Sequence, residues 1–138
     1  MPVADTEFLF ALNPRDRKHQ HAMRLLRELS GLMVPDTAIL EFQVVLKARG
    51  RRPSQVRAAL LALHEVLMRS DVREVKTIST GLLASQSELE ERYGLSYFDS
   101  LIAASALTLD RQVVSDDEAL DEVPGLRRIP ISAPEKAN

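Results

Sequence analysis

Short apolar segments that read as strands alternate along this chain with longer segments that read as helices. The strand-like segments are Pro2-Val3-Ala4, Leu32-Met33-Val34, Val72–Ile78, Gln112–Val114 and a last short run ending at Ile129. Strands that alternate with helices imply βαβ units and a parallel sheet covered on both faces. The alternation therefore predicts an α/β fold with three layers, α/β/α, around a central, mainly parallel sheet.

The helical segments between these strands have clear limits. We expect helices over residues 6–12, 15–29, 36–49, 54–69 and 80–93, another that starts near Ser96, and a short one over residues 118–122. Asn13-Pro14 is a turn pair, and Gly31 and Gly94 follow helix ends as C-caps do. A chain of 138 residues is long enough to bury a single core without disulfides or structural metals. We predict one domain, 1–133, and a polar tail, 134–138.

Composition excludes several kinds of site. The chain has no cysteine, so it has no disulfides, thiolate metal sites or cysteine nucleophile. The chain has only three histidines, which argues against a zinc site built from histidine ligands. There is no run of the ~20 apolar residues that a membrane span needs and no signal pattern, so we expect a cytoplasmic protein. The net charge of −2 gives no overall attraction to nucleic acid, which leaves local basic patches.

Acidic residues stand where strands end and where helices begin. Asp5 follows the first strand, Ser115-Asp116-Asp117 follows the strand at 112–114, and Asp99 lies in the first turn of a helix. Each has an ordinary reading: Asp5 as a helix N-cap, Ser96-x-x-Asp99 as a capping box, and the adjacent aspartates as a polar strand exit. In α/β sheets, however, sites form outside the carboxyl ends of the strands.

Glu41 is unusual for its position within a helix. At 100° per residue it shares a face with apolar residues such as Ala38 and Val45, whereas Gln43 and Lys47 point to nearly the opposite side. A carboxylate buried without a partner costs several kcal/mol, so this one needs a cation, a proton or hydrogen bonds. The alternative is a glutamate at the edge of the apolar stripe that reaches water.

If these acids converge, their mutual repulsion requires a divalent cation. Ligands that are all oxygen favour Mg²⁺ or Mn²⁺ over zinc. An incompletely enclosed ion of this kind activates water and stabilises charge on a phosphate, which is the chemistry of a phosphodiester nuclease.

Four segments of the chain resemble the acidic motifs of the PIN domain family, in the family's order. They are VADTEFL, PDTAILEF, LSYFDSLIAASAL and VVSDDEALDEVPGLRRI, and together they span nearly the whole chain. The length is similar to that of a stand-alone PIN ribonuclease of the VapC type. The resemblance implies metal-dependent RNA cleavage with Mg²⁺ or Mn²⁺, frequent homodimers and, in many members, a small VapB-like antitoxin partner.

The resemblance also assigns roles to individual residues. It places Asp5, Glu41, Asp99 and Asp117 at the catalytic, metal-binding positions, with Asp116 as the alternative ligand to Asp117, and Thr6 and Ser115 as the accompanying hydroxyl residues. The position after Thr6 is commonly a small polar residue in the family, and here it is Glu7. That difference concerns fine geometry or metal preference.

Two basic clusters are candidates to hold RNA phosphates: Arg49, Arg51 and Arg52, and Arg15, Arg17 and Lys18. Their ordinary reading is a solvated surface. The apolar helix at 56–68 suggests a surface for a partner or a second copy.

Two alternatives to the nuclease remain. One is a PIN fold that serves as a non-catalytic RNA-binding or scaffolding module. The other is a Mg²⁺ phosphotransfer enzyme with an acceptor aspartate, for which Lys76 is the only plausible lysine.

Overall fold

The computed structural model describes residues 1–132 and contains one parallel sheet of five strands. The strands are β1 (Val3–Ala4), β2 (Met33–Pro35), β3 (Arg73–Val75), β4 (Gln112–Val114) and β5 (Arg127–Ile129). Their order across the sheet is β3-β2-β1-β4-β5, and each neighbouring pair is parallel. The predicted three-layer α/β/α fold is confirmed.

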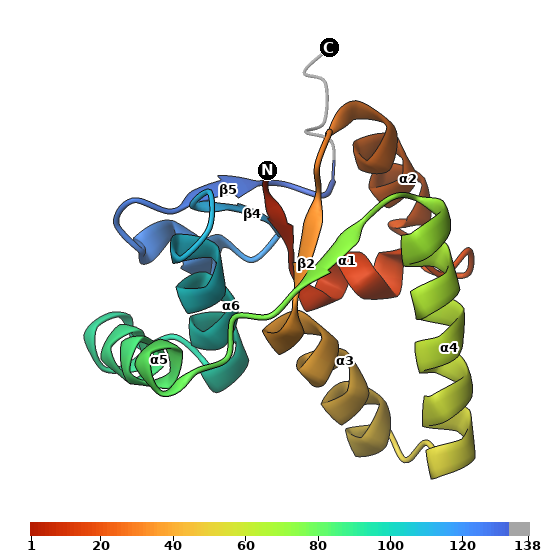
Figure 1. The fold of residues 1–138 in the computed structure, drawn as a ribbon, viewed down its shortest axis with the longest axis horizontal. Helices are drawn as coiled ribbons and strands as arrows, with labels where there is room; N and C mark the ends of the chain where they lie inside the picture. Colours follow the sequence, from red (N-terminus) through yellow and green to blue (C-terminus); the bar gives the residue numbers. More distant parts are fainter. Residues whose placement is uncertain (133–138) are drawn as a thin grey trace.

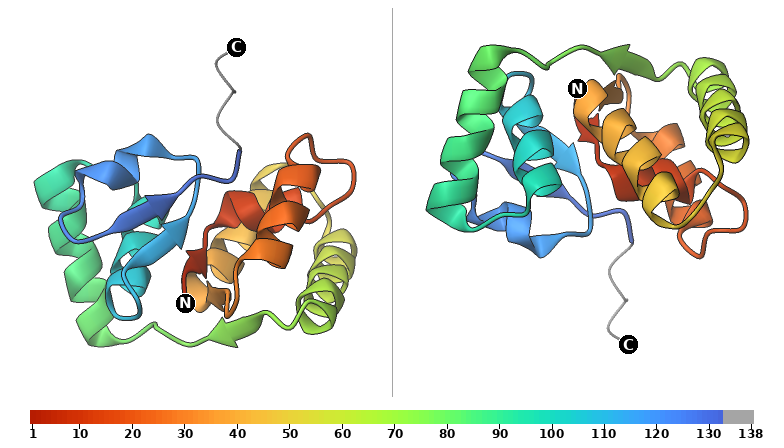
Figure 2. Two further views of the ribbon diagram at one scale, coloured as in Figure 1. Left: turned by 90° about the horizontal axis from the view of Figure 1, so that it is seen from above. Right: turned by 90° about the horizontal axis from the view of Figure 1, so that it is seen from below.

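Helices fill the connections between the strands (Figure 1). They are α1 (Thr6–Ala11), α2 (His19–Glu28), α3 (Asp36–Ala48), α4 (Pro53–Arg69), α5 (Thr80–Tyr93), α6 (Tyr97–Leu107) and the short 3₁₀ helix η1 (Glu118–Glu122). Both further views keep α5 and α6 packed together at one end of the molecule and α2 and α4 at the other (Figure 2). Among residues 1–132, no helix is both long and apolar enough to span a bilayer.

The strand order has a reversal at its centre that determines where a site can form. From β1 the chain first moves outward through β2 to β3, and then returns to the other side of β1 to add β4 and β5. Ala4 pairs with Val114, so Asp5 and Ser115 leave the sheet side by side between two diverging connections. This is the topological switch point at which open α/β sheets bind their ligands.

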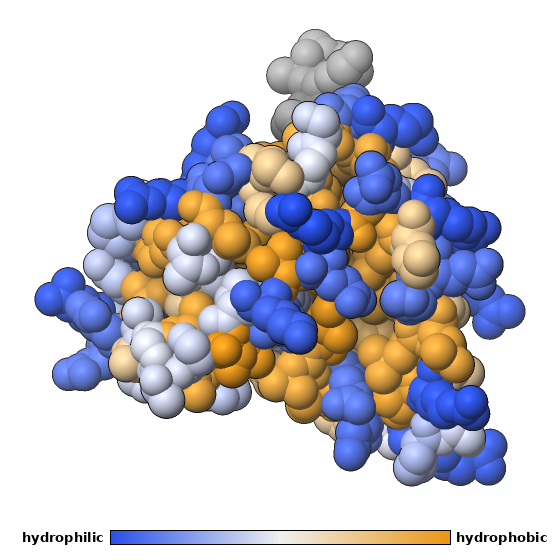
Figure 3. Space-filling model, in the orientation of Figure 1, coloured by the Kyte–Doolittle hydropathy of each residue, from blue (hydrophilic) through white to orange (hydrophobic). Residues whose placement is uncertain are grey.

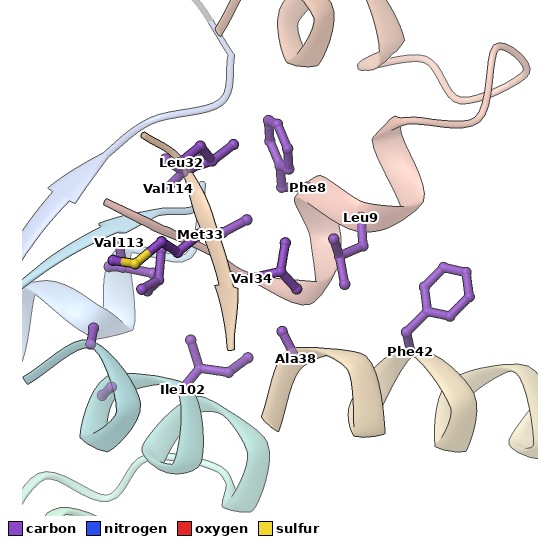
Figure 4. Packing of buried hydrophobic residues seen from close by; sticks show 14 of the residues in the cluster. Phe8, Leu9, Leu32, Met33, Val34, Ala38, Phe42, Ile102, Val113 and Val114 are labelled. Atoms are coloured by element: carbon purple, nitrogen blue, oxygen red, sulfur yellow. The ribbon is translucent and has the colours of Figure 1, made fainter. Parts of the chain in front are cut away.

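Small side chains let helices α3 and α6 approach the centre of the sheet. Ala38, Ala103 and Ala106 are fully buried, and Figure 4 shows Val34 of β2, Ala38 of α3 and Ile102 of α6 pointing into a common core. The hydroxyls of Thr37, Ser105 and Thr77 also bond to one another, at 2.8 and 2.9 Å. These contacts fix the two helices that carry Glu41 and Asp99.

The structure departs from the predicted elements in two places. Helix α2 begins at His19 rather than at residue 15, because the carboxamide of Asn13 and the carboxylate of Asp16 accept hydrogen bonds from the amides of Arg15 and Lys18 and form turns there. Strand β3 stops at Val75, well short of Ile78.

The early end of β3 also has a local cause. The amides of Thr77 and Ile78 donate to the carboxylate of Asp36 rather than to a neighbouring strand. The single domain of 1–133 stays a prediction, and the polar tail predicted at 134–138 lies outside the described residues.

Candidate functional site

A cavity of about 410 Å³ opens at the switch point of the sheet. All four acids predicted as catalytic line it, although they come from four separate segments of the chain. The complete lining is Asp5, Thr6, Glu7, Phe10, Asp16, Arg17, Lys18, Glu41, Val45, Arg49, Asp99, Ile102 and Asp117.

Asp5 is the most deeply buried of the four acids, with 7% of its surface exposed. One carboxylate oxygen accepts from the amide of Phe8 at 2.9 Å and so caps α1, as the ordinary reading predicts. Burial raises the pKa of Asp5 to about 7, against the opposing effect of hydrogen bonds from Ser115 and the Phe8 amide. The capping role and a position in the cavity therefore coexist in one residue.

Glu41 lies on the cavity side of α3, with Val45 one turn further along the same helix. The hydroxyl of Thr6 donates a hydrogen bond to its carboxylate. Partial burial raises the pKa of Glu41, the Thr6 hydroxyl lowers it, and the nearby charge of Asp117 raises it again. Thr6 thus orients the partly buried carboxylate of Glu41.

Asp99 and Asp117 form a close acidic pair. Ser96 accepts from the amide of Asp99 at 3.2 Å, which places Asp99 in the first turn of α6. Burial and then the adjacent carboxyl of Asp117 raise the pKa of Asp99 to about 6. Ser115 fixes the other member, because its buried hydroxyl accepts from the amide of Asp117 at 3.0 Å. Both carboxyls line the cavity.

Asp116 is engaged elsewhere. Its carboxylate accepts from Lys18 at 2.7 Å, from the amide of Ile131 at 2.8 Å and from the hydroxyl of Ser132 at 2.8 Å. Partial burial opposes ionisation of Asp116, but the hydrogen bonds from Lys18 and Ser132 lower its pKa to about 2. Asp116 is not among the residues that line the cavity.

Neither of the two predicted basic clusters stays together in the structure. Arg49, Arg17 and Lys18 line the acidic cavity. Arg51 instead lines a neighbouring groove between α3 and α4, and Arg52 is the N-cap residue immediately before α4.

Lys18 has a structural role that its sequence position does not reveal. Its ammonium group pairs with Glu7 at 2.8 Å and with Asp116 at 2.7 Å. Glu7, the residue that differs from the usual motif, is therefore neutralised by a lysine eleven positions further along the chain. These ion pairs join Lys18 to residues 11 and 98 positions away, so no local sequence motif predicts them.

The donor set of the cavity fits a hard divalent cation. Its acidic side chains offer only carboxylate oxygens, the ligands that Mg²⁺ and Mn²⁺ prefer. Three of the four candidate acids have raised pKa values, which a cation would reverse. As the side chains stand in residues 1–132, no group of three or more is arranged closely enough to hold an ion.

Comparison with known proteins identifies a family and a group of similar folds. The family model of the PIN domain matches residues 3–126. Comparison with curated protein sequences gives no match.

Solved structures give several matches over nearly the whole chain. A toxin-antitoxin complex from Klebsiella pneumoniae is 19% identical, with a TM-score of 0.67, and the match covers 96% of this chain and 98% of that one. VapC20 of Mycobacterium tuberculosis, a toxin that cleaves the sarcin-ricin loop, is 20% identical with a TM-score of 0.69, over 88% and 93% of the two chains. VapBC2 of Rickettsia felis, bound to a DNA fragment of its promoter, is 19% identical with a TM-score of 0.66, over 93% and 96%. At these identities the likeness concerns the fold.

Proposed function

This chain belongs to the PIN domain family, and from that premise we propose that it is a metal-dependent endoribonuclease that hydrolyses RNA phosphodiester bonds. One observation carries the proposal. The four candidate carboxylates, Asp5, Glu41, Asp99 and Asp117, come from four separate segments and line a single cavity at the switch point of a parallel sheet. Like charges gathered around one cavity favour a bound cation, and a divalent cation assists the hydrolysis of phosphodiesters.

Each residue of the cavity has a defined part in the proposed reaction. Asp5, Glu41, Asp99 and Asp117 would hold Mg²⁺ or Mn²⁺. A bound divalent ion supplies an activated water and stabilises the charge that develops on the phosphate. The Thr6 hydroxyl donates a hydrogen bond to the carboxylate of Glu41. The Ser115 hydroxyl accepts from the backbone amide of Asp117 and so fixes the backbone that carries the Asp117 side chain.

Asp117 is the better candidate than Asp116 for the fourth ligand. Asp117 lines the cavity, whereas the carboxylate of Asp116 is already bound by a lysine, two amides and a hydroxyl. A metal ligand needs free lone pairs that face the ion, and the carboxylate oxygens of Asp116 already accept these hydrogen bonds.

We further propose that the enzyme is the toxin of a toxin–antitoxin pair with a VapB-like antitoxin. The similar folds include a toxin-antitoxin complex and VapBC2, which support this assignment. Induced expression of the wild-type chain in a bacterium should then arrest growth, and Asp99→Asn should relieve the arrest. Equal growth inhibition by both would count against a toxin that acts through this cavity.

The phosphotransfer alternative has less support. It requires a lysine beside the acceptor aspartate, but Lys76 is exposed beyond β3, the edge strand of the sheet. The scaffolding alternative makes a different prediction, namely RNA binding without cleavage.

Cleavage of a mixed RNA pool tests the proposal. We expect cutting with Mg²⁺ or Mn²⁺, none with EDTA, and a loss of at least about a hundredfold in Asp99→Asn, since the variant removes one charge from the ligand set. Glu118→Gln is the matched control, because Glu118 is an exposed acid next to Asp117. Cutting that survives in Asp99→Asn would overturn the proposal, and so would wild-type cutting that EDTA leaves unchanged.

A further inference from the structure

The cavity that holds the four acids also holds two arginines, Arg17 and Arg49. Lys18, the third basic residue in the lining, is neutralised by Glu7 and Asp116. Within residues 1–132, by contrast, neither arginine forms an ion pair with a carboxylate. Two positive charges at an acidic site thus remain available to a ligand.

Arg49 stands at the end of α3, the helix that carries Glu41. Glu41, Val45 and Arg49 are spaced four residues apart and all line the cavity. At a rise of about 1.5 Å per residue, the eight residues from Glu41 place Arg49 about 12 Å further along the helix axis. Arg49 therefore lines the cavity at a distance from Glu41 rather than beside it.

The guanidinium of Arg49 is held in place by an aromatic pair. Its central carbon lies 4.9 Å from the centre of the Phe10 ring. Phe10 in turn stacks on Phe42 at 4.5 Å, and Phe42 is buried in the core. An arginine that lies over an aromatic face keeps its N–H edges free to bind a phosphate, and little conformational entropy is lost when it does so.

We propose that Arg49, supported by Phe10 and accompanied by Arg17, forms a phosphate-binding subsite for single-stranded RNA beside the acidic cluster. The inference rests on the proposed function and names the group that holds the substrate there. Its physical reason is the charge of the site: a cavity lined by carboxylates repels RNA, and arginines in the same cavity offset that repulsion.

Fluorescence anisotropy with short, labelled, single-stranded RNA of randomised sequence tests the subsite. The measurement uses Asp99→Asn protein in EDTA, so that binding is read without cleavage. We expect Arg49→Gln to weaken binding about tenfold. The slope of the logarithm of the binding constant against the logarithm of salt concentration should fall by about 0.7, the value for one phosphate contact on a single strand. Arg49→Lys should recover only part of the affinity, because lysine keeps the charge but not the stacked planar group.

Arg51→Gln is the matched control, since it removes the same charge two residues away and outside the acidic cavity. Equal losses in Arg49→Gln and Arg51→Gln would overturn the subsite, because they would indicate general attraction to a basic surface. Unchanged RNA affinity in Arg49→Gln would do the same, even if the wild type cleaves RNA. An Arg49-dependent loss of binding in a chain that never cleaves RNA would keep the subsite and contradict the nuclease.

Discussion

Asp5 caps a helix with a carboxylate that is buried, so its contribution to the free energy of unfolding depends on pH. Its carboxylate accepts the Phe8 amide in the first turn of α1. Burial raises its pKa from 3.8 to about 7, so the unfolded chain loses this proton at a lower pH than the folded one does. Without metal, the free energy of unfolding should therefore fall as the pH rises from about 4 to about 7.

The variant Asp5→Asn tests whether the carboxyl of Asp5 causes this dependence on pH. Asparagine keeps an oxygen that can cap α1 but cannot ionise, so the fall in the free energy of unfolding between these pH values should shrink by about 2–4 kcal/mol. Urea titrations in EDTA across this pH range measure it, with Asp71→Asn as an exposed control. If Asp5→Asn shows the same pH dependence as the wild type, the buried carboxyl of Asp5 is not its source.

At the scale of elements, the loop after β4 is tied to the start of α2. Lys18 immediately precedes α2, and its bond to Asp116 fixes one face of the loop while Asp117 turns toward the cavity. Asp116 also accepts from the amides of residues 131 and 132, which follow β5. One carboxylate thereby joins three segments at the rim of the site.

Replacing Lys18 with methionine should loosen this junction. We expect Lys18→Met to lower the free energy of unfolding at neutral pH by about 1–2 kcal/mol, less than for a fully buried pair because both partners retain some solvent contact. The pKa of Asp116 is lowered from 3.8 to about 2, so its contribution is present above pH 3.8 and is lost as the pH falls toward 2.

Chemical denaturation at several pH values measures both effects, and Lys47→Met is the control for loss of an exposed charge. The variant should lose less stability than the wild type between pH 4 and pH 2, because Asp116 then has a pKa closer to its ordinary value. If Lys18→Met loses as much stability as the wild type between pH 4 and pH 2, this account is contradicted.

The elements also show what the sequence can and cannot predict. Alternating apolar and helical segments predicted the parallel sheet, and the face of Glu41 predicted its approach to the cavity. Strand β3 was predicted too long, because its end depends on Asp36, which binds amides some forty residues away. The Lys18–Asp116 pair and the Arg49–Phe10 contact escaped notice for the same reason: each joins residues that only the fold brings together.

For the whole molecule, the predicted membership of the PIN family is confirmed by a match over residues 3–126. The predicted homodimer stays a proposal, and one surface supports it. Helix α4 exposes Leu61 and Met68, at 57% and 68%, and Figure 3 shows apolar surface where α3 and α4 lie. Apolar side chains gathered on one face are typical of a partner interface.

The double variant Leu61→Glu/Met68→Glu tests the dimer. We expect a wild-type dimer and a monomeric variant by light scattering after size-exclusion chromatography, because burying two carboxylates in an interface is unfavourable. Leu83→Glu, which places a carboxylate at an exposed apolar position of α5, should leave the dimer intact. A dimer that persists in the double variant would place the interface elsewhere, and a monomeric wild type would remove the proposal.

The central claim is that four acids from separate segments act as one metal site, and a calorimetric titration with Mn²⁺ tests it most directly. The account predicts that the wild type binds Mn²⁺, that Asp99→Asn loses this binding, and that Asp116→Asn keeps it because Asp116 is committed to Lys18 and residues 131 and 132. Binding should be stronger at pH 8 than at pH 6, since Mn²⁺ must displace protons from carboxyls whose pKa values are raised to about 6 and 7. No binding by the wild type, or equal loss in Asp99→Asn and Asp116→Asn, would contradict the account.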